Sequence, residues 1–347
     1  MANDTLEGNR RPPIPRQASR GASLLDAIEG TLADFLAAQI AALDATDPAL
    51  GGLARTTRDL VLAGGKRLRP TFAYWGWRAV SDDPVEPVLP ALAALELMHT
   101  FALVHDDVMD ESATRRGRPT AHRIFARQHG ARFGESAAIL VGDLCLVWAD
   151  QLLARTPMPT ATLFAVRARY DRMRVDAIAG QYLDLLGDRE PGQWSVDRAL
   201  LVARLKTASY TVQRPLQFGL ALAEPASPVV DEAFERYGAL VGEAFQLRDD
   251  LLGAFGDPAV TGKPAGDDLR SGKPTALLLL ARQLRPDISD ISGEAIAATG
   301  APEAVEAMIR QRVAAAVAGL AAAPIAAEAR AALSELAVRA TQRPCDS

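Results

Sequence analysis

The chain contains few cysteines, few aromatic residues and no excess of basic charge. Cys145 and Cys345 are too few for a disulfide framework or a cysteine-rich metal site, and they fit a reducing cytoplasm. Hydrophobic residues make up 49% of the 347 positions but aromatic residues only 5%, a mixture rich in Ala and Leu that favours helices over strands. The net charge of -5 argues against a general nucleic-acid binder, whose surface would be basic.

The chain also lacks a long uncharged apolar run and an apolar N-terminus. No run reaches the roughly 18 uncharged residues of a membrane span, so stable membrane insertion is not expected. Residues 1–22 hold Pro12, Pro13 and Pro15 among several arginines, without the apolar core of a secretory signal. These residues predict a disordered tail on a cytoplasmic protein.

Apolar residues recur at helical spacing along almost the whole chain. No linker divides the pattern, so 23–347 predicts a single all-α domain, a bundle of many helices around a deep central cavity. The stretch 256–274 is dense in Gly, Pro and charge and predicts a mobile loop. Breaks at Pro and Gly give expected helices at about 24–43, 52–63, 68–80, 86–110, 119–130, 134–155, 159–187, 194–222, 229–254, 274–285, 302–321 and 325–341.

Two groups of carboxylates stand at the ends of apolar segments. Asp106, Asp107 and Asp110 fall within five residues, and Asp249 and Asp250 end a later segment. Residues four apart lie on one face of a helix, so Asp106 and Asp110 can point at the same place, where their like charges require cations. Hard oxygen ligands without neighbouring Cys or His favour magnesium over zinc. One such group alone is equally well interpreted as a solvated helix end, but its recurrence favours a magnesium site.

Basic residues follow these carboxylates and occupy further motifs. Arg and Lys are well suited to phosphate oxygens, Arg as a planar fork of donors and Lys as a point charge. Each alone is best interpreted as a surface charge. Together with two magnesium-type groups they predict a site for two polyanions, one bound through metal and one bound directly. The residues concerned are Lys66, Arg67, Arg69, Arg115, Arg116, Lys206, Lys263 and Lys273.

The order and spacing of these motifs resemble the trans-isoprenyl diphosphate synthases, the polyprenyl synthetase family, and most of all the geranylgeranyl diphosphate synthases of actinobacteria. The resemblance extends from Gly64 to Thr275 and implies the all-α isoprenoid synthase fold. The motifs that carry it are Gly-Gly-Lys-Arg-Leu-Arg-Pro (64–70), His99, Val-His-Asp-Asp-Val-Met-Asp (104–110), Arg-Arg-Gly-Arg-Pro-Thr (115–120), Gly-Gln-Tyr-Leu-Asp (180–184), Lys-Thr (206–207), Phe-Gln-Leu-Arg-Asp-Asp (245–250), and the Gly-Lys pairs at 262–263 and 272–273.

The resemblance assigns these residues to two diphosphate sites. It implies about three magnesium ions around an allylic diphosphate, held by Asp106, Asp107, Asp110, Asp249 and Asp250. It implies that the same diphosphate is contacted by Arg115, Lys206, Lys263 and Lys273. The isopentenyl diphosphate site would be formed by Lys66, Arg67, His99 and Arg116. Thr207 and Gln246 would lie beside the developing carbocation, and Gln181 and Asp184 would support the metal region.

Two positions complicate these assignments. A lone His in an apolar helix is usually a hydrogen-bonded core residue. His99, however, falls on one helical stripe with Ala102 and Asp106, which favours a place in the same cavity.

The family's second motif commonly ends in a third Asp, whereas position 253 is Gly and Asp257 follows four residues later. This departure leaves the roles of Asp250 and Asp257 open.

The resemblance also implies a reaction and a product. The enzyme would condense isopentenyl diphosphate with an allylic diphosphate, release pyrophosphate and act as a homodimer. Family members that stop at fifteen carbons often carry bulky aromatics four and five residues before the first Asp, where this chain has Ala102 and Phe101. This favours the twenty-carbon geranylgeranyl diphosphate, with a farnesyl or longer-chain product as the alternative. If Phe101 only packs between helices, another residue sets the length.

Two other functions fit these motifs less well. A class I terpene cyclase normally carries a second metal motif that begins with Asn or Asp and contains Ser or Thr and Glu. Asn occurs only at positions 3 and 9, and Asp249, Gly253 and Asp257 supply neither hydroxyl nor Glu. An inactive regulatory subunit would usually lose aspartates from the first motif, and all three are present. Both alternatives are therefore disfavoured.

Overall fold

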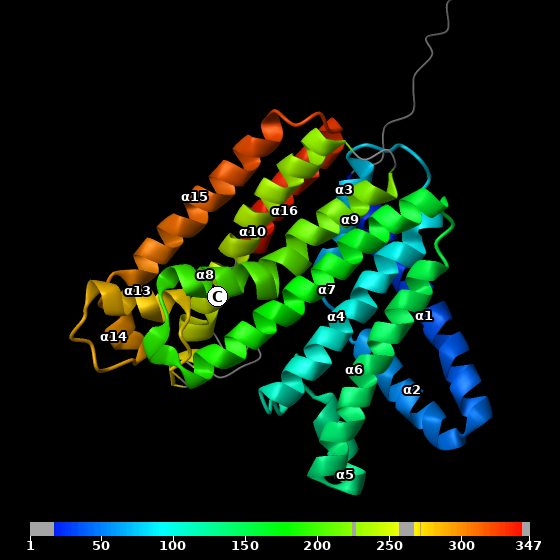
Figure 1. Ribbon diagram of the computed structural model, residues 1–347, viewed down its shortest axis with the longest axis horizontal. Coiled ribbons are helices and arrows are strands. Elements are labelled where there is room, and N and C mark those ends of the chain that lie inside the picture. Colours follow the sequence, from blue (N-terminus) through cyan, green and yellow to red (C-terminus); the bar gives the residue numbers. More distant parts are fainter. Residues whose placement is uncertain (1–16, 224–226, 257–266, 271, 342–347) are drawn as a thin grey trace, which may run out of the picture.

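The computed structural model describes residues 17–223, 227–256, 267–270 and 272–341. Most of the expected N-terminal tail lies outside this part of the chain, as do Asp257, Lys263 and most of the expected loop at 256–274. Within the described residues the fold is all-α, as the composition predicts, apart from one short β-hairpin (Figure 1). The first helix begins at Gln17, inside the segment expected to be a tail.

The first half of the chain packs around one central helix, α4, which contacts α1, α2, α3, α5 and α6. Its residues Leu92, Leu95 and Met98 are completely buried, because apolar residues cover nearly its whole circumference. The elements of this half are α1 (Gln17–Thr46), α2 (Pro48–Val61), α3 (Leu68–Arg78), η1 (Glu86–Val88), α4 (Leu89–Met109), β1 (Thr114–Arg115), β2 (Arg118–Pro119), α5 (Ala121–His129) and α6 (Ala131–Ala154).

The second half is arranged around α10, which packs against η3, α13, α15 and α16. Helices α10, α15 and α16 run side by side at one end of the molecule (Figure 1). The elements of this half are α7 (Thr160–Arg189), η2 (Pro191–Gln193), α8 (Val196–Val202), the π-helix η3 (Ala203–Gln213), α9 (Arg214–Leu222), α10 (Pro228–Phe255), α12 (Asp267–Arg270), α13 (Ala276–Leu284), α14 (Gly293–Ala297), α15 (Ala301–Ala321) and α16 (Ala327–Thr341).

Two segments, Glu86–Met109 and Ala131–Ala154, are long and apolar enough to cross a membrane by length and composition. In the fold, 61% of the apolar window of the first segment and 50% of that of the second are buried. Burial inside a helical bundle explains an apolar circumference without a bilayer. Helix α4 thus forms the middle of the N-terminal half, whereas α6 leaves apolar side chains such as Leu140 and Val147 exposed.

The single helix expected at 194–222 is in fact divided. After α8 ends at Val202, the chain forms an 11-residue π-helix, and α9 begins at Arg214. Glycines on two neighbouring helices allow close packing here, because Gly180 lies against the backbone of Lys206 and Gly242 against that of Ala208. Apolar periodicity does not separate a π-helix from an α-helix. Such segments are rare and are often found at functional sites.

A β-hairpin stands at 114–119, where the sequence predicted no strand. Thr114 pairs with Pro119 and Arg115 with Arg118. The two residues between the strands, Arg116 and Gly117, have φ angles of 52° and 71°. Positive φ at both central positions is the signature of the type I′ turn that suits a two-residue hairpin loop. The turn places Arg116 at the hairpin tip.

Helices α3 and α9 cross at two glycines. A Cβ on Gly219 would collide with the carbonyl oxygen of Ala73, and a Cβ on Gly76 would collide with that of Leu216. Both obstacles are backbone atoms, which cannot rotate away. The crossing fixes the start of α3, which carries the basic turn at 64–70.

We predict that Gly219→Ala lowers the free energy of unfolding by about 1–3 kcal/mol, because overpacking at a rigid contact forces backbone shifts. Gly30→Ala is the matched control, since nothing lies within 4 Å of a Cβ on Gly30 in helix α1. This control should gain up to about 1 kcal/mol from helix propensity. Urea denaturation of both variants measures the difference, and equal stabilities would contradict the tight crossing.

Candidate active site

Asp106 lies in the last turn of α4, and Asp110 caps the helix. The C-terminus of a helix carries partial negative charge, so carboxylates there are unfavourable unless cations compensate them. The cations are Lys206, with its Nζ 3.3 Å from an Asp106 oxygen, and Arg115, with an Nη 3.2 Å from the other oxygen. Burial alone would raise the pKa of Asp106, but these two cations outweigh burial and lower it.

Asp110 is the less compensated member of the pair. Burial and the negative charge of Asp106 raise the pKa of Asp110, and Asp184 adds to the effect. Lys206 and Lys273 oppose the rise without cancelling it. The ionised form of a carboxylate whose charge is not fully balanced is stabilised by any additional cation.

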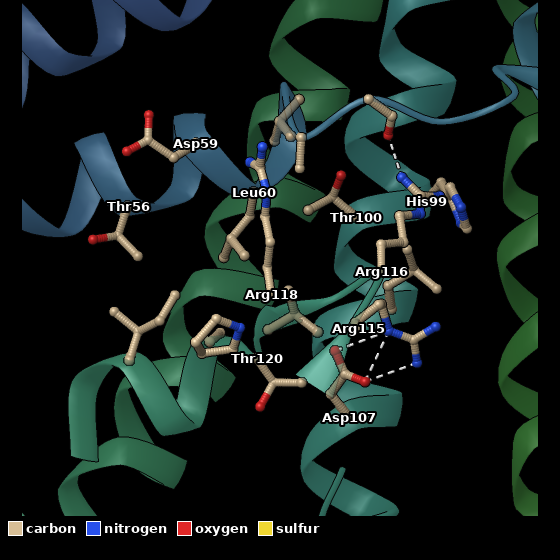
Figure 2. A pocket seen from close by; sticks show the side chains of 18 of the residues that line it. Thr56, Asp59, Leu60, His99, Thr100, Asp107, Arg115, Arg116, Arg118 and Thr120 are labelled. Atoms are coloured by element: carbon tan, nitrogen blue, oxygen red, sulfur yellow. Dashed lines mark hydrogen bonds and ion pairs between the residues drawn. The ribbon is translucent and has the colours of Figure 1, made fainter. Parts of the chain in front are cut away.

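Asp107 points to another side of α4. Its carboxylate accepts two bonds from Arg115 Nε at 2.8 and 3.0 Å, as the dashed lines in Figure 2 show. Burial raises the pKa of Asp107 despite this partner. One guanidinium therefore joins Asp106 and Asp107, and it fixes the hairpin against the end of α4.

Asp184 on α7 completes the acidic group. One of its oxygens lies 2.6 Å from Lys206 Nζ and 2.8 Å from Lys273 Nζ. Burial opposes ionisation, but the two ammonium groups outweigh it and lower the pKa of Asp184. Two lysines from distant parts of the chain thus meet the carboxylates of α4 and α7.

These carboxylates form a donor set that suits magnesium. Within the described residues, His, Cys, Asp and Glu side chains do not form a group of three or more with metal-binding geometry. The ammonium group of Lys206 instead lies between Asp106 and Asp184. Hard oxygen donors, incompletely compensated at the exposed Asp110, are the kind of ligands that Mg²⁺ accepts.

The second acidic pair lies on α10, which packs against the π-helix. Thr207 donates to Gln246 Oε1 at 2.6 Å, next to Lys206, which reaches Asp106. The π-helix therefore contacts α4 through Lys206 and α10 through Thr207. Asp250 is buried and accepts bonds from Gln246 Nε2 and from the backbone N–H of Ala276, so it supports the start of α13. Asp249 is partly exposed.

A basic face lies beside this group. His99 Nδ1 lies 3.3 Å from the Tyr210 hydroxyl, and the Arg69 guanidinium lies 4.0 Å above the Tyr210 ring. Arg69 also donates to Thr211 at 2.8 Å, while its buried Nε has no hydrogen-bond partner among the described residues. Burial, followed by the positive charge of Arg69 and then of Arg116, holds the pKa of His99 well below its ordinary value. His99 is therefore a neutral side chain among cations.

Arg67 occupies a different environment from the one its motif predicts. It has a left-handed φ of 46° at the start of α3, and its buried guanidinium contacts Glu29 at 2.6 Å and Glu96 at 2.5 Å. A further bond goes to the Val61 carbonyl. Most of its donors are thus engaged by the protein. Arg69, by contrast, contacts the uncharged side chains of Thr211 and Tyr210.

The basic motif at 64–70 contains Arg69, but the family resemblance assigns it no role. A signal was present, because Arg69, Phe72, Ala73 and Gly76 follow helical spacing and form the buried side of α3.

The lysine content of the chain also points to the motif residues. The chain has only four lysines, Lys66, Lys206, Lys263 and Lys273, and each stands in one of the motifs. Lys66 is exposed in the basic turn, and Lys263 lies outside the described residues.

The chain is similar to known proteins in both sequence and fold. The sequence profile described as polyprenyl synthetase matches residues 52–311. The chain is similar to a solved geranylgeranyl pyrophosphate synthase from Corynebacterium glutamicum, complexed with isoprenyl diphosphate and magnesium, at 40% identity and a TM-score of 0.87. That similarity covers 92% of this chain and 99% of the other.

Two further relatives differ in the product that they are named for. A geranylgeranyl diphosphate synthase of Mycobacterium tuberculosis is 37% identical over 74% of this chain and 68% of its own length. A geranylfarnesyl diphosphate synthase of Aeropyrum pernix is 35% identical over 67% of this chain and 72% of its own length. The similarity thus extends across synthases whose named products differ in length.

We predict that Arg67→Ala lowers the free energy of unfolding by about 3–5 kcal/mol, because it leaves the buried Glu96 carboxylate without its partner. Arg118→Ala is the control, since Arg118 is exposed and should change stability by less than about 0.5 kcal/mol. Thermal and urea denaturation measure both. A fully stable Arg67→Ala variant would mean that Arg67 is free to serve another purpose.

Proposed function

The chain belongs to the polyprenyl synthetase family, and from this premise we propose that it is a short-chain trans-prenyltransferase of the cytoplasm. It condenses isopentenyl diphosphate with an allylic diphosphate and releases pyrophosphate. The observation that carries this proposal is the meeting of Lys206 and Lys273 with Asp106 and Asp184 beside a separate basic face. The arrangement supplies two places for two diphosphates.

The family is magnesium-dependent, and Asp106, Asp110 and Asp249 are the carboxylates that we assign to the metal. Asp107 and Asp250 support them through Arg115 and through Gln246 and α13. The number of ions, three, is part of the proposal. Magnesium bound here stabilises the negative charge that develops on the leaving diphosphate.

The basic residues of the allylic site act on the same charge. Lys206, Lys273 and Arg115 pair with carboxylates in this structure, and each can turn its donors to phosphate oxygens when a diphosphate arrives. Donors that are already placed stabilise the developing charge without a large reorganisation. Lys263 is assigned to the same diphosphate by its motif alone.

The isopentenyl diphosphate site is assigned to Lys66, Arg69, His99 and Arg116, with Arg67 as a support. Tyr210 joins Arg69 and His99, so these two side chains are held in fixed positions. Holding the second substrate in one orientation converts a bimolecular attack into an effectively unimolecular one.

Thr207 and Gln246 face the place where the allylic cation forms. The Thr207 hydroxyl donates to Gln246 Oε1, which leaves the oxygen lone pairs of this pair to face positive charge. The cation is attacked by the double bond of isopentenyl diphosphate, and the proton then lost passes to the departing pyrophosphate. Apolar walls must exclude water, which would otherwise trap the cation.

The direct test is to incubate the purified protein alone with Mg²⁺, isopentenyl diphosphate and an allylic primer. A prenyltransferase consumes isopentenyl diphosphate and lengthens the primer. A terpene cyclase consumes the primer alone, and a regulatory subunit consumes neither.

We predict that Asp106→Ala lowers kcat by at least about a hundredfold, because contacts to transition-state charge typically contribute that much. Asp249→Ala should do the same. Lys66→Ala should instead raise KM for isopentenyl diphosphate, because it removes a binding contact from the other site. Steady-state kinetics with circular dichroism as a fold control separates the cases. Near-normal turnover in both aspartate variants would refute the metal assignment.

We propose geranylgeranyl diphosphate as the product. Positions four and five before Asp106 lie roughly 6 to 8 Å down α4, where the growing chain would reach. Ala102 there is small, and the Phe101 ring is buried edge-on against His105 at 4.9 Å. His105 in turn contacts the Ile139 carbonyl of α6, so the Phe101 ring packs against a side chain that α6 holds in place. An aromatic ring held in this way is a suitable floor for the product cavity.

We predict that Phe101→Ala lengthens the product and that Ala102→Phe shortens it. Leu103→Ala is the matched control, because Leu103 lies on the other flank of α4 and should leave the length unchanged. Chromatography of the dephosphorylated products measures chain length. If both variants give the wild-type distribution, the floor lies elsewhere.

We also propose that the protein is a homodimer. Phe164, Val175, Ile178 and Tyr182 fall on one face of α7 and are 55–71% exposed. Leu140 and Val147 are likewise exposed on α6. An apolar stripe of this extent on two long helices is typical of a surface that another copy covers.

We predict that Phe164→Glu converts the dimer to a monomer at micromolar concentration, because it places a charge inside the apolar contact. Leu284→Glu is the control, since Leu284 is exposed on α13, away from these helices. Light scattering measures the mass. A wild-type protein that is monomeric and fully active would refute the proposal.

A further inference from the structure

Helix α7 carries a buried carboxylate that the proposed reaction does not use. This residue, Asp176, is 3% exposed. Its Oδ2 accepts a hydrogen bond from Ser209 Oγ at 2.8 Å and another from Arg214 Nε at 3.1 Å. Its Oδ1 lies 2.8 Å from Arg172 Nε on the same helix. Hydrogen bonds to carboxylates are among the stronger ones in proteins, so these contacts hold Ser209 and Arg214 to α7.

Ser209 and Arg214 are five residues apart, yet they donate to the same oxygen atom. In an α-helix with about 3.6 residues per turn, positions five apart point roughly 140° away from each other. In a π-helix the backbone bonds join positions five apart, so their side chains lie close together. The N–H of Arg214 does bond to the carbonyl of Ser209. The single oxygen of Asp176 therefore fits the π spacing and not the α spacing.

Asp176 belongs to a stripe of α7 that contacts the π-helix. Asp176, Gly180 and Asp184 are spaced four apart and lie on one face of the helix. A Cβ on Gly180 would collide with the backbone of Lys206, and Asp184 Oδ2 lies 2.6 Å from Lys206 Nζ. The stripe thus holds the π-helix at two places, around Lys206 and at its C-terminal end.

The contacts of the π-helix with α10 do not fix its spacing in the same way. Arg204 donates to Glu243 at 3.0 Å, and Thr207 donates to Gln246 at 2.6 Å. Each of these bonds holds one position of the π-helix. The Oδ2 of Asp176 joins two positions instead, so it specifies how the backbone winds between them.

The winding of the π-helix decides where its functional side chains point. Lys206 and Tyr210 reach side chains of α4, whereas Thr207 reaches α10. A shift of the backbone by one residue would turn each of these side chains by roughly 100° about the helix axis. Such a turn would break the three contacts together, and a misplacement of only about 1 Å can lower a rate by about a hundredfold.

We propose that Asp176 is a positioning residue, which fixes the π winding and thereby places Lys206 and Thr207 for prenyl transfer. It acts through Ser209 and Arg214 and not through the substrates. The roles of Lys206 and Thr207 rest on the proposed function. The winding itself is a property of the fold, so it can be measured without any reaction.

The first test is the steady-state kinetics of full-length variants with Mg²⁺, isopentenyl diphosphate and an allylic primer. Asp176→Ala should lower kcat by about a hundredfold, and Asp176→Asn, which keeps one acceptor oxygen, by about tenfold. KM for isopentenyl diphosphate should change by less than about threefold, because the residues assigned to that site lie mostly outside the π-helix. A variant that is merely less stable would not separate kcat from KM in this way.

Asp150→Asn is the matched control. Asp150 also pairs with two arginines of α7, but it lies on α6 and is not bonded to the π-helix. Its loss should leave kcat within about twofold of the wild type.

A milder variant covers the case in which the Asp176 variants do not fold. Ser209→Ala removes one hydroxyl and leaves the carboxylate in place, and it should lower kcat by about fivefold. Arg214 keeps its bond to Gln217 Oε1 at 2.8 Å in each of these variants, so α9 stays anchored.

The second test is amide hydrogen exchange, which needs no turnover. In Asp176→Asn the amides of residues 203–214 should exchange at least about tenfold faster than in the wild type, while those of α15 keep their rates. A general loss of stability would instead speed exchange in both regions.

Faster exchange confined to the π-helix, together with the fall in kcat, supports the proposal. Unchanged exchange in the π-helix would overturn it, as would equal acceleration in α15 or a kcat no lower than that of Asp150→Asn. An inactive wild type refutes the proposed function, and the exchange measurement then decides the role of Asp176 by itself.

Discussion

The pairing of Lys206 with Asp106 and Asp184 is the interaction on which the active site depends. Carboxylates at the C-terminus of a buried helix are opposed by the helix dipole and by desolvation, so they require cations from elsewhere in the chain. Lys206 reaches both carboxylates from the π-helix, and Lys273 reaches Asp184 from the segment before α13. The same lysines can exchange a carboxylate for a phosphate. Their position therefore couples the state of the acidic group to the presence of a diphosphate.

Backbone irregularities bring these side chains together. The π-helix carries Lys206, Thr207 and Tyr210, and the type I′ turn presents Arg116. Glycines on the neighbouring helices allow the close packing that both the π-helix and the α3–α9 crossing need. Local geometry of this kind is tolerated because the surrounding buried helices fix it.

The sequence predicts most of the helices, because apolar periodicity is a local signal. The all-α class and the family are confirmed. The π-helix, the hairpin and the different contacts of Arg67 and Arg69 do not follow from the sequence pattern. Each depends on contacts between residues far apart in the chain, such as those of Arg67 with Glu96 and of Arg69 with Tyr210. Motif spacing contains no information about which arginine the fold turns toward a carboxylate.

The exchange of Lys206 from carboxylate to phosphate is tested most directly by a crystal structure with Mg²⁺ and an unreactive allylic thiolodiphosphate. The account predicts that Lys206 Nζ leaves Asp106 and contacts a phosphate oxygen, while Asp106 binds a divalent ion. It also predicts that Arg67 remains on Glu96. A complex in which Lys206 stays on Asp106 while the diphosphate binds elsewhere would contradict the account.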